Sequence, residues 1–158
     1  MIIEIEKDRL PECLAVLQSS YEASAVAFGM TEENCPYRGR TRLPLAKLEE
    51  EYTHGCSMYG FLRKGRLAGF LSLSASGGIL CIQDIAVLPS FQNQGIGNAL
   101  MRFALEKAKT LHCNTVRLGM VDDNARLKAW YERFGFRTVA LKEYAAVSYK
   151  VGTMELSL

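Results

Sequence analysis

Hydrophobic and polar residues follow two different periods along this chain, and each change of period marks the end of an element. Apolar residues spaced three or four positions apart predict helices with one buried face, at 10–27, 45–54, 96–111 and 125–134. Alternating or continuous apolar runs predict strands, at 2–5, 57–63, 66–74, 79–87, 115–121, 136–141 and 149–158. The predicted order is therefore β-α-α-β-β-β-α-β-α-β-β, without a repeat or an internal linker.

Short polar signals fix several ends of these elements. Lys64 and Gly65 fit a two-residue hairpin turn between the second and third strands. Asn124 closes an Asp-Asp-Asn run that is typical of a helix N-cap. The strand at 79–87 carries few charges, so we expect it near the centre of a sheet.

Residues 30–43 follow neither period. Pro36 and Gly39 indicate an exposed loop, and Arg38, Arg40 and Arg42 recur at every second position within it. Two interpretations of the arginines stay open. They form a solvated face, or they clamp an acidic group of a substrate.

The composition is that of one globular domain spanning residues 1–158. Hydrophobic residues make up 49% of the chain and charged residues 23%, which is enough apolar material for a core. A formal charge of +2 is too small to favour nucleic acid. No apolar run reaches the roughly 20 residues that cross a bilayer. Glu4 and Glu6 stand where a signal peptide needs a basic or apolar residue.

The cysteines predict a reducing environment. They are odd in number and far apart, at Cys13, Cys35, Cys56, Cys81 and Cys113. We interpret them as free thiols of a cytoplasmic protein. No cysteine or histidine pair has the spacing of zinc ligands, so no metal is expected.

The most informative stretch is 83–98, which reads QDIAVLPSFQNQGIGN. It predicts a buried strand, a tight loop and the N-terminus of a long amphipathic helix. Backbone N–H groups and the positive end of the helix dipole point out of such a loop, so it suits an anion such as a phosphate. By itself the pattern is weak, because Gly95 and Gly97 also suit a turn that only needs close packing.

Two common phosphate-binding motifs are absent from this stretch. It has no lysine of the kind found in a P-loop. It also lacks the three glycines of a dinucleotide-binding fingerprint. A nucleotide triphosphatase is therefore disfavoured.

A second motif lies at 124–136 and reads NARLKAWYERFGF. Together, Q-x-x-G-x-G in the first stretch and N-x-x-L-x-x-W-Y-x-x-x-G-F in the second resemble the GNAT superfamily of N-acetyltransferases. The resemblance covers residues 57–136 and extends to the order of the elements. It implies an α/β (α+β) fold, with a mixed, mostly antiparallel sheet of about seven strands flanked by about four helices.

The resemblance implies acetyl-CoA as the acyl donor and assigns residues to it. The strand main chain would face the pantetheine arm, at Ile85, Ala86 and Val87. The loop and the helix start would surround the diphosphate, at Gln92, Asn93, Gln94, Gly95, Ile96, Gly97 and Asn98. The loop carries no cation, and Arg102, Arg126 and Lys128 are possible phosphate partners or plain surface charges. Asn124 would cap its helix, contact the donor, or do both.

The resemblance also places Tyr131 beside the sulfur of the donor. A phenol with a pKa near ~10 can protonate a departing thiolate. The alternative is an aromatic anchor whose hydroxyl bonds the backbone. Trp130 and Phe134 are interpreted as packing residues.

The motifs do not assign the general base to a single residue. Asp84 is the first candidate because related proteins often place an acid on this strand, although a loop-facing carboxylate bonded to backbone N–H groups is the alternative. Gln83 and Gly119 stand where some relatives carry acids. The weaker candidates are Glu33, His54, Glu143 and Tyr144.

The sequence therefore predicts transfer of an acetyl group from acetyl-CoA to a primary amine of a small molecule or peptide. We expect direct attack in a ternary complex, with an oxyanion stabilised by main-chain N–H near Val87, rather than a route through Cys81. The alternative is a non-catalytic module that senses acyl-CoA. We expect a monomer or homodimer whose partners are the donor and the amine, without nucleic acid or membrane.

Overall fold

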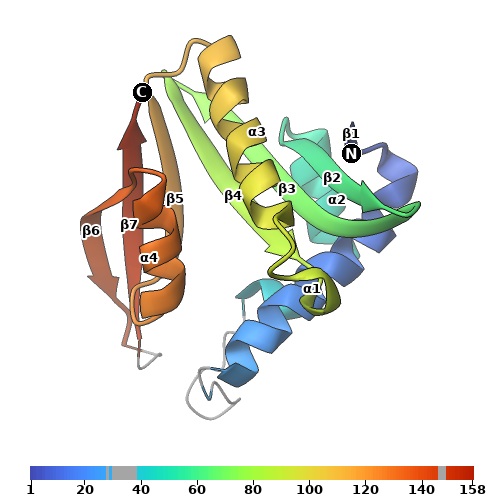
Figure 1. Cartoon of the computed structure of the whole chain (residues 1–158), viewed down its shortest axis with the longest axis horizontal. Coiled ribbons are helices and arrows are strands. Elements are labelled where there is room, and N and C mark those ends of the chain that lie inside the picture. Colours follow the sequence, from blue (N-terminus) through green and yellow to red (C-terminus); the bar gives the residue numbers. More distant parts are fainter. Residues whose placement is uncertain (28, 30–38, 146–148) are drawn as a thin grey trace.

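The computed structural model describes residues 1–27, 29, 39–145 and 149–158. They form one seven-stranded sheet in the order β1-β2-β3-β4-β5-β7-β6 (Figure 1). The strands are β1 Ile2–Glu4, β2 Ser57–Arg63, β3 Arg66–Ser76, β4 Ile79–Val87, β5 Thr115–Val121, β6 Arg137–Glu143 and β7 Lys150–Ser157. Neighbouring strands are antiparallel, apart from the parallel pair β4 and β5. The predicted mixed, mostly antiparallel α/β (α+β) fold is confirmed.

Within the described residues, four α-helices cover the sheet. They are α1 Leu10–Ala27, α2 Leu45–Thr53, α3 Ile96–Thr110 and α4 Ala125–Arg133. Short 3₁₀ turns occur at η1 Lys7–Arg9, η2 Gly39–Arg42 and η3 Pro89–Phe91. The predicted cap at Asn124 is confirmed, because its Oδ1 accepts a hydrogen bond from the Leu127 N–H at 3.0 Å. None of these helices has the length and apolar character needed to span a bilayer.

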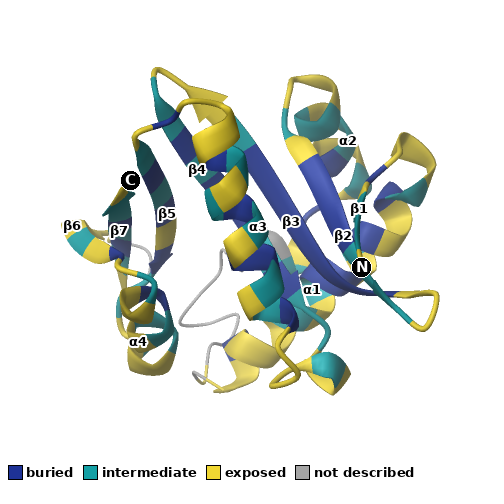
Figure 2. Ribbon diagram, turned by 45° about the horizontal axis from the view of Figure 1, so that its top comes forward, coloured by how far each residue is buried: buried dark blue, intermediate teal, exposed yellow. Residues whose placement is uncertain are grey.

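The sheet separates two hydrophobic cores. Helices α3 and α4 pack on one face, where their residues join those of β3, β4, β5 and β7 (Figure 1). Helices α1 and α2 pack on the other face against β2 and β3. Figure 2 shows β3 buried along most of its length, because it lies between both layers. Side chains of the sheet can therefore face either core.

Phe70 is the large side chain through which β3 meets the layer formed by α1 and α2. It is fully buried. We expect Phe70→Ala to lower the free energy of unfolding by about 3–5 kcal/mol, because the deletion removes buried apolar surface and leaves a cavity. Urea denaturation would measure this change. Val26→Ala, at a side chain that is 69% exposed, is the control and should shift the value by less than about 0.5 kcal/mol. A loss below about 1 kcal/mol for Phe70→Ala would contradict the packing described here.

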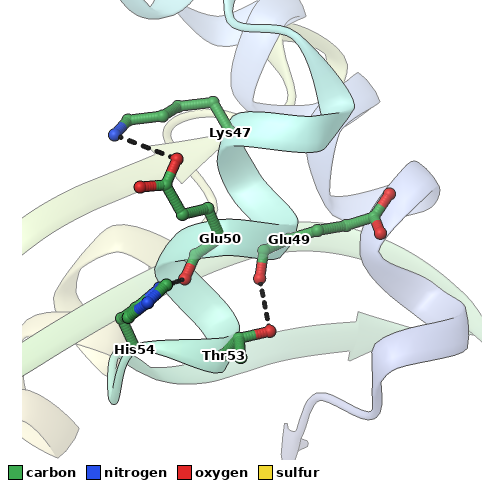
Figure 3. Close-up of polar contacts among 5 residues, drawn as sticks. All are labelled: Lys47, Glu49, Glu50, Thr53 and His54. Atoms are coloured by element: carbon green, nitrogen blue, oxygen red, sulfur yellow. Dashed lines mark hydrogen bonds and ion pairs between the residues drawn. The ribbon is translucent and has the colours of Figure 1, made fainter.

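Side chains at the end of α2 contact the backbone carbonyls of its last turns, as Figure 3 shows. Thr53 Oγ1 donates to the Glu49 carbonyl at 2.9 Å, and His54 Nδ1 lies 2.8 Å from the Glu50 carbonyl. The Lys47 ammonium also lies 3.5 Å from the Glu50 carboxylate. The Glu50 carbonyl also accepts the His54 backbone N–H at 2.9 Å, so the side chains add further hydrogen bonds to carbonyls near the end of the helix. They give His54 a local structural role.

Strands β4 and β5 pair only over part of their length. The register runs from Ile79 opposite Thr115 to Ile82 opposite Leu118. Beyond Leu118 the two strands diverge (Figure 1), while β5 stays paired with β7 as far as Val121. The edge of β4 that faces β5 is therefore left without a strand partner from Gln83 onward. We call this feature the fork.

A β-bulge in β4 lies at the start of the fork. Ser72 pairs with Asp84, whereas the next residue of β3, Leu73, pairs with Ile82, which leaves Gln83 as the extra residue. The bulge reverses which side chains face which layer. Ile85 packs with the α3 and α4 core, and Asp84 turns toward α1. A regular strand would have placed Asp84 on the opposite face.

Candidate active site

The loop after β4 presents free backbone donors at the open end of the fork. Gly95 is the N-cap of α3 with φ +84°, and it supplies no side-chain cap. Asn93 also has positive φ, at +60°. The first intrahelical bond of α3 runs from Ala99 N–H to the Gly95 carbonyl, whereas the Gln92 N–H already donates to Pro89. Among the described residues the backbone N–H groups of residues 93–98 have no partner, and such a group of donors suits an anion.

Gly97 leaves a narrow space between α3 and α4. A Cβ at this position would lie 3.4 Å from Trp130 Cζ2. The indole also crosses from α4 to α3, because its Nε1–H donates to Asn98 Oδ1 at 2.9 Å. Trp130 packs against neighbouring rings, as predicted, but it also joins the two helices that border the fork. The Asn98 side chain is therefore engaged by the indole.

Tyr131 lies in the core beneath α4, with only 5% of its surface exposed. Its ring packs edge-on against Phe136 at a centroid distance of 5.9 Å and lies 5.1 Å from the Trp130 ring. Burial raises the pKa of the phenol well above its usual value. Among the described residues its hydroxyl has no hydrogen-bond partner. The group is therefore a neutral donor throughout the physiological range.

Asp84 lies on the opposite side of β4 and is 1% exposed. The Tyr21 hydroxyl, from α1, donates to its Oδ1 at 3.5 Å. Ser72 is directly opposite on β3. Its hydroxyl is fully buried and has no hydrogen-bond partner in the described part of the chain. Sequence reasoning did not identify Tyr21 or Ser72, because neither belongs to a local motif that includes Asp84.

A cavity of about 180 Å³ lies where the fork begins. It is lined by Cys81, Ile82, Gln83, Arg117, Leu118, Gly119 and Thr153. Gly119 leaves room here, because a Cβ would meet only the Gly152 carbonyl, at 3.9 Å. Arg117 and Glu155 form an ion pair of 3.1 Å at its edge. The cavity adjoins the β4 residues predicted to contact the donor.

The remaining candidates are spread over the molecule. Glu143 and Tyr144 are exposed at the end of β6, and Lys150 lies 3.5 Å from the Glu143 carboxylate. Gln83 is exposed and bonds Ser74 at 2.8 Å. Glu33 and Arg38 lie outside the described residues. Within the described chain, no group of three or more His, Cys, Asp or Glu side chains is arranged to hold a metal.

The structure places the three cations that are possible phosphate partners or plain surface charges on α3 and α4. Lys128 binds Asp122 at 2.8 Å, and this hydrogen bond raises the pKa of its ammonium group. Arg102 and Arg126 are exposed, and within the described residues neither makes a hydrogen bond or ion pair. Another cation contacts the loop, because Arg63 at the end of β2 donates to Gln94 Oε1 at 2.8 Å. The two residues are 31 positions apart, so sequence spacing contained no signal for this contact.

Comparisons with known proteins identify the family and the fold. The model of the acetyltransferase (GNAT) family matches residues 25–136. The chain is 33% identical over 92 residues to the uncharacterized protein YdhI of Bacillus subtilis, covering 52% of this chain and 58% of YdhI. It is 30% identical over 99 residues to the uncharacterized N-acetyltransferase YvbK of the same organism, covering 62% and 64% of the two chains. The matches thus span less than two thirds of either relative.

A solved structure supports the fold over the full chain. The PaiA N-acetyltransferase of Thermoplasma acidophilum, in complex with coenzyme A, superimposes with a TM-score of 0.83. The alignment covers 100% of this chain and 98% of that one, at 18% sequence identity. At this level of identity the likeness establishes the architecture.

Proposed function

The chain belongs to the GNAT acetyltransferase family, and we propose that it transfers an acetyl group from acetyl-CoA to a primary amine. The observation that carries this proposal is the fork. The edge of β4 without a strand partner runs to Val87, and residues 88–95 connect it to the uncapped N-terminus of α3. This stretch offers donors first for an extended amide-containing arm and then for a diphosphate. The similar PaiA structure was solved with coenzyme A, which supports the same kind of donor here.

The residues present fit coenzyme A. The main chain of Ile85, Ala86 and Val87 would bond the amides of pantetheine along the free edge. Gln92 and the backbone N–H groups of Asn93 to Asn98 would surround the diphosphate, and Gly97 allows close approach. Asn124 would stay at its cap position and border the narrow space between α3 and α4. When bound, acetyl-CoA supplies the activated thioester.

Asp84 is proposed as the base for the acceptor amine. An amine with a pKa near ~10 is largely protonated at neutral pH and must lose a proton to attack. Asp84 accepts this proton, directly or through a water, while Tyr21 holds its carboxylate. The amine nitrogen then forms a bond with the acyl carbon and loses its second proton to solvent, and Asp84 passes the first proton on to solvent. The cavity where the fork begins is the proposed position of the acceptor.

Tyr131 is proposed as the acid. As the carbon–sulfur bond breaks, its hydroxyl delivers a proton to the departing thiolate, and the phenolate regains one from solvent. Burial keeps the phenol protonated until that moment. A main-chain N–H near Val87 stabilises the oxyanion. Cys81 lines the cavity, but among the described residues it has no hydrogen-bonded base, so direct attack is favoured over an acyl-cysteine.

Thiol release from acetyl-CoA across a panel of small amines, peptides and aminoglycosides tests the proposal. We expect acceptor-dependent release together with thermal stabilisation by coenzyme A. Stabilisation without turnover on any acceptor would favour the alternative, a module that senses acyl-CoA. The absence of any binding would overturn both.

Gly97→Ala tests whether the donor passes through the narrow space between α3 and α4. The added methyl lies toward Trp130, so we expect the Kd for coenzyme A to rise about tenfold, equivalent to losing one good contact. The unliganded protein should not lose stability, because alanine is preferred over glycine in helices by up to about 1 kcal/mol. Calorimetric titration and thermal unfolding would separate these effects. An unchanged Kd would contradict passage of the donor past Gly97.

A further inference from the structure

The hairpin between β2 and β3 brings two arginines to the anion loop. Arg63 ends β2 and donates from Nη1 to Gln94 Oε1 at 2.8 Å. Arg66 begins β3, and its guanidinium lies 5.8 Å from the centre of the Phe91 ring. Gln94 and Phe91 both belong to the segment between β4 and α3. The hairpin is therefore held against this loop through side chains at both of its corners.

These two cations have no carboxylate partner. Within the described residues neither arginine takes part in an ion pair, whereas Lys128, Arg117 and Lys109 each do. Residues 89–98 contain no charged side chain either. The loop thus combines free backbone donors with two uncompensated positive charges that come from a distant part of the sequence. An anion is the ligand that this arrangement attracts.

We propose that Arg63 and Arg66 bind phosphate groups of the acyl-CoA donor, with Gln94 as the residue that positions Arg63. The inference rests on the proposed function, because it assigns further residues to the same donor. A guanidinium has five N–H donors in a planar fork. Gln94 uses one donor of Arg63, so others remain for two parallel bonds to a phosphate. Arg66 is steadied by the aromatic face of Phe91.

Coenzyme A offers two kinds of phosphate, the diphosphate and the 3′-phosphate of its ribose. Both share the chemistry that a guanidinium recognises. Dephospho-coenzyme A lacks only the 3′-phosphate, so it separates the two sources. An arginine that binds the 3′-phosphate contributes nothing to the affinity for dephospho-coenzyme A, whereas one that binds the diphosphate contributes equally to both ligands.

The experiment is calorimetric titration of the full chain with each ligand. Trp130, the single tryptophan, gives a second readout by fluorescence, because it contacts the first turn of α3. We expect Arg63→Ala and Arg66→Ala each to raise the Kd for coenzyme A about tenfold, as for a lost charge-assisted hydrogen bond. Arg63→Lys should recover part of the loss, since it keeps the charge without the planar fork.

Lys64→Gln is the matched control. It removes one charge from the same hairpin, at an exposed residue that makes no hydrogen bond or ion pair within the described part of the chain, and should change the Kd less than about threefold. Raising the salt concentration should weaken binding by the wild type more than by the double arginine variant.

The outcomes distinguish a failure of this inference from a failure of the proposed function. If the wild type binds coenzyme A and both arginine variants bind equally well, the inference fails and the proposed function stands. If Lys64→Gln weakens binding as much as Arg63→Ala, the effect is one of overall charge and the assigned contacts are wrong. If the wild type binds neither ligand, the proposed function itself fails.

Discussion

Asp84→Asn is expected to lower the rate of acetyl transfer at neutral pH by about 100- to 10,000-fold, the usual contribution of a general base. The asparagine keeps the size of the side chain and can still accept from the Tyr21 hydroxyl, but it cannot take a proton from the amine. Steady-state kinetics with a reactive acceptor would measure the loss. The affinity for coenzyme A should stay close to that of the wild type, because Asp84 turns away from the core beneath α3 and α4.

Two further measurements distinguish the loss of a general base from a general loss of activity. Above the pKa of the acceptor amine, near ~10, the deficit should narrow, because the amine then arrives deprotonated. Glu106→Gln is the matched control, since it converts an exposed carboxylate of α3, paired with Lys109, to an amide in the same way. A rate within about threefold of wild type for Asp84→Asn would remove this residue from the role of base.

Tyr131→Phe is expected to lower turnover by about 10- to 1000-fold, on the lower side of the range for loss of a general acid. Phenylalanine preserves the ring that packs on Phe136 and Trp130, so the fold and the affinity for coenzyme A should be nearly unchanged. The variant would be compared with wild type by thiol release under saturating acetyl-CoA.

The burial of the phenol also predicts how the effect of Tyr131→Phe on the rate depends on pH. Its pKa is raised, so the hydroxyl is protonated at every pH below its ordinary value of about 10. The ratio of wild-type to variant rates should therefore be constant between about pH 6 and 9. Tyr59→Phe, at another buried tyrosine of the same core, should leave turnover intact. If both variants behave alike, Tyr131 acts through packing.

The same raised pKa has a consequence for stability. Below pH 10 the phenol is neutral in both the folded and unfolded chains. Above it, the unfolded chain ionises first, so stability attributable to Tyr131 falls as the pH rises toward its folded value. The Cys13 thiol acts in the same direction, because burial raises its pKa to about 12.

Much of the fold was predictable because its signals are local. The period of apolar residues placed the helices and strands, and Asn124 marked a cap that the structure confirms. The anion loop was predictable for the same reason, since Gly95 must adopt positive φ within a few residues of the helix start. The motifs at 92–97 and 124–136 together indicated the family, which the family model then matched.

The contact between Arg63 and Gln94 shows what local reasoning does not reach. Arg102, Arg126 and Lys128 were considered as possible phosphate partners or plain surface charges, and both interpretations stay predictions. The Arg63 contact joins the end of β2 to the loop before α3, 31 residues further along the chain. The spacing of apolar residues carries no information on a contact between such distant segments.

By itself, the sequence determined the order of the elements, the shape of the anion loop and the family, since each depends on residues within a short window. Only the tertiary structure decided toward which layer each candidate side chain points and which strand edge is left unpaired. The bulge at Gln83 turns Asp84 toward α1, the loss of pairing after Leu118 opens the fork, and Trp130 joins α4 to α3. These features arise from strand register and side-chain packing between segments that are far apart in the chain, and one extra residue in a strand reverses the face of every side chain after it.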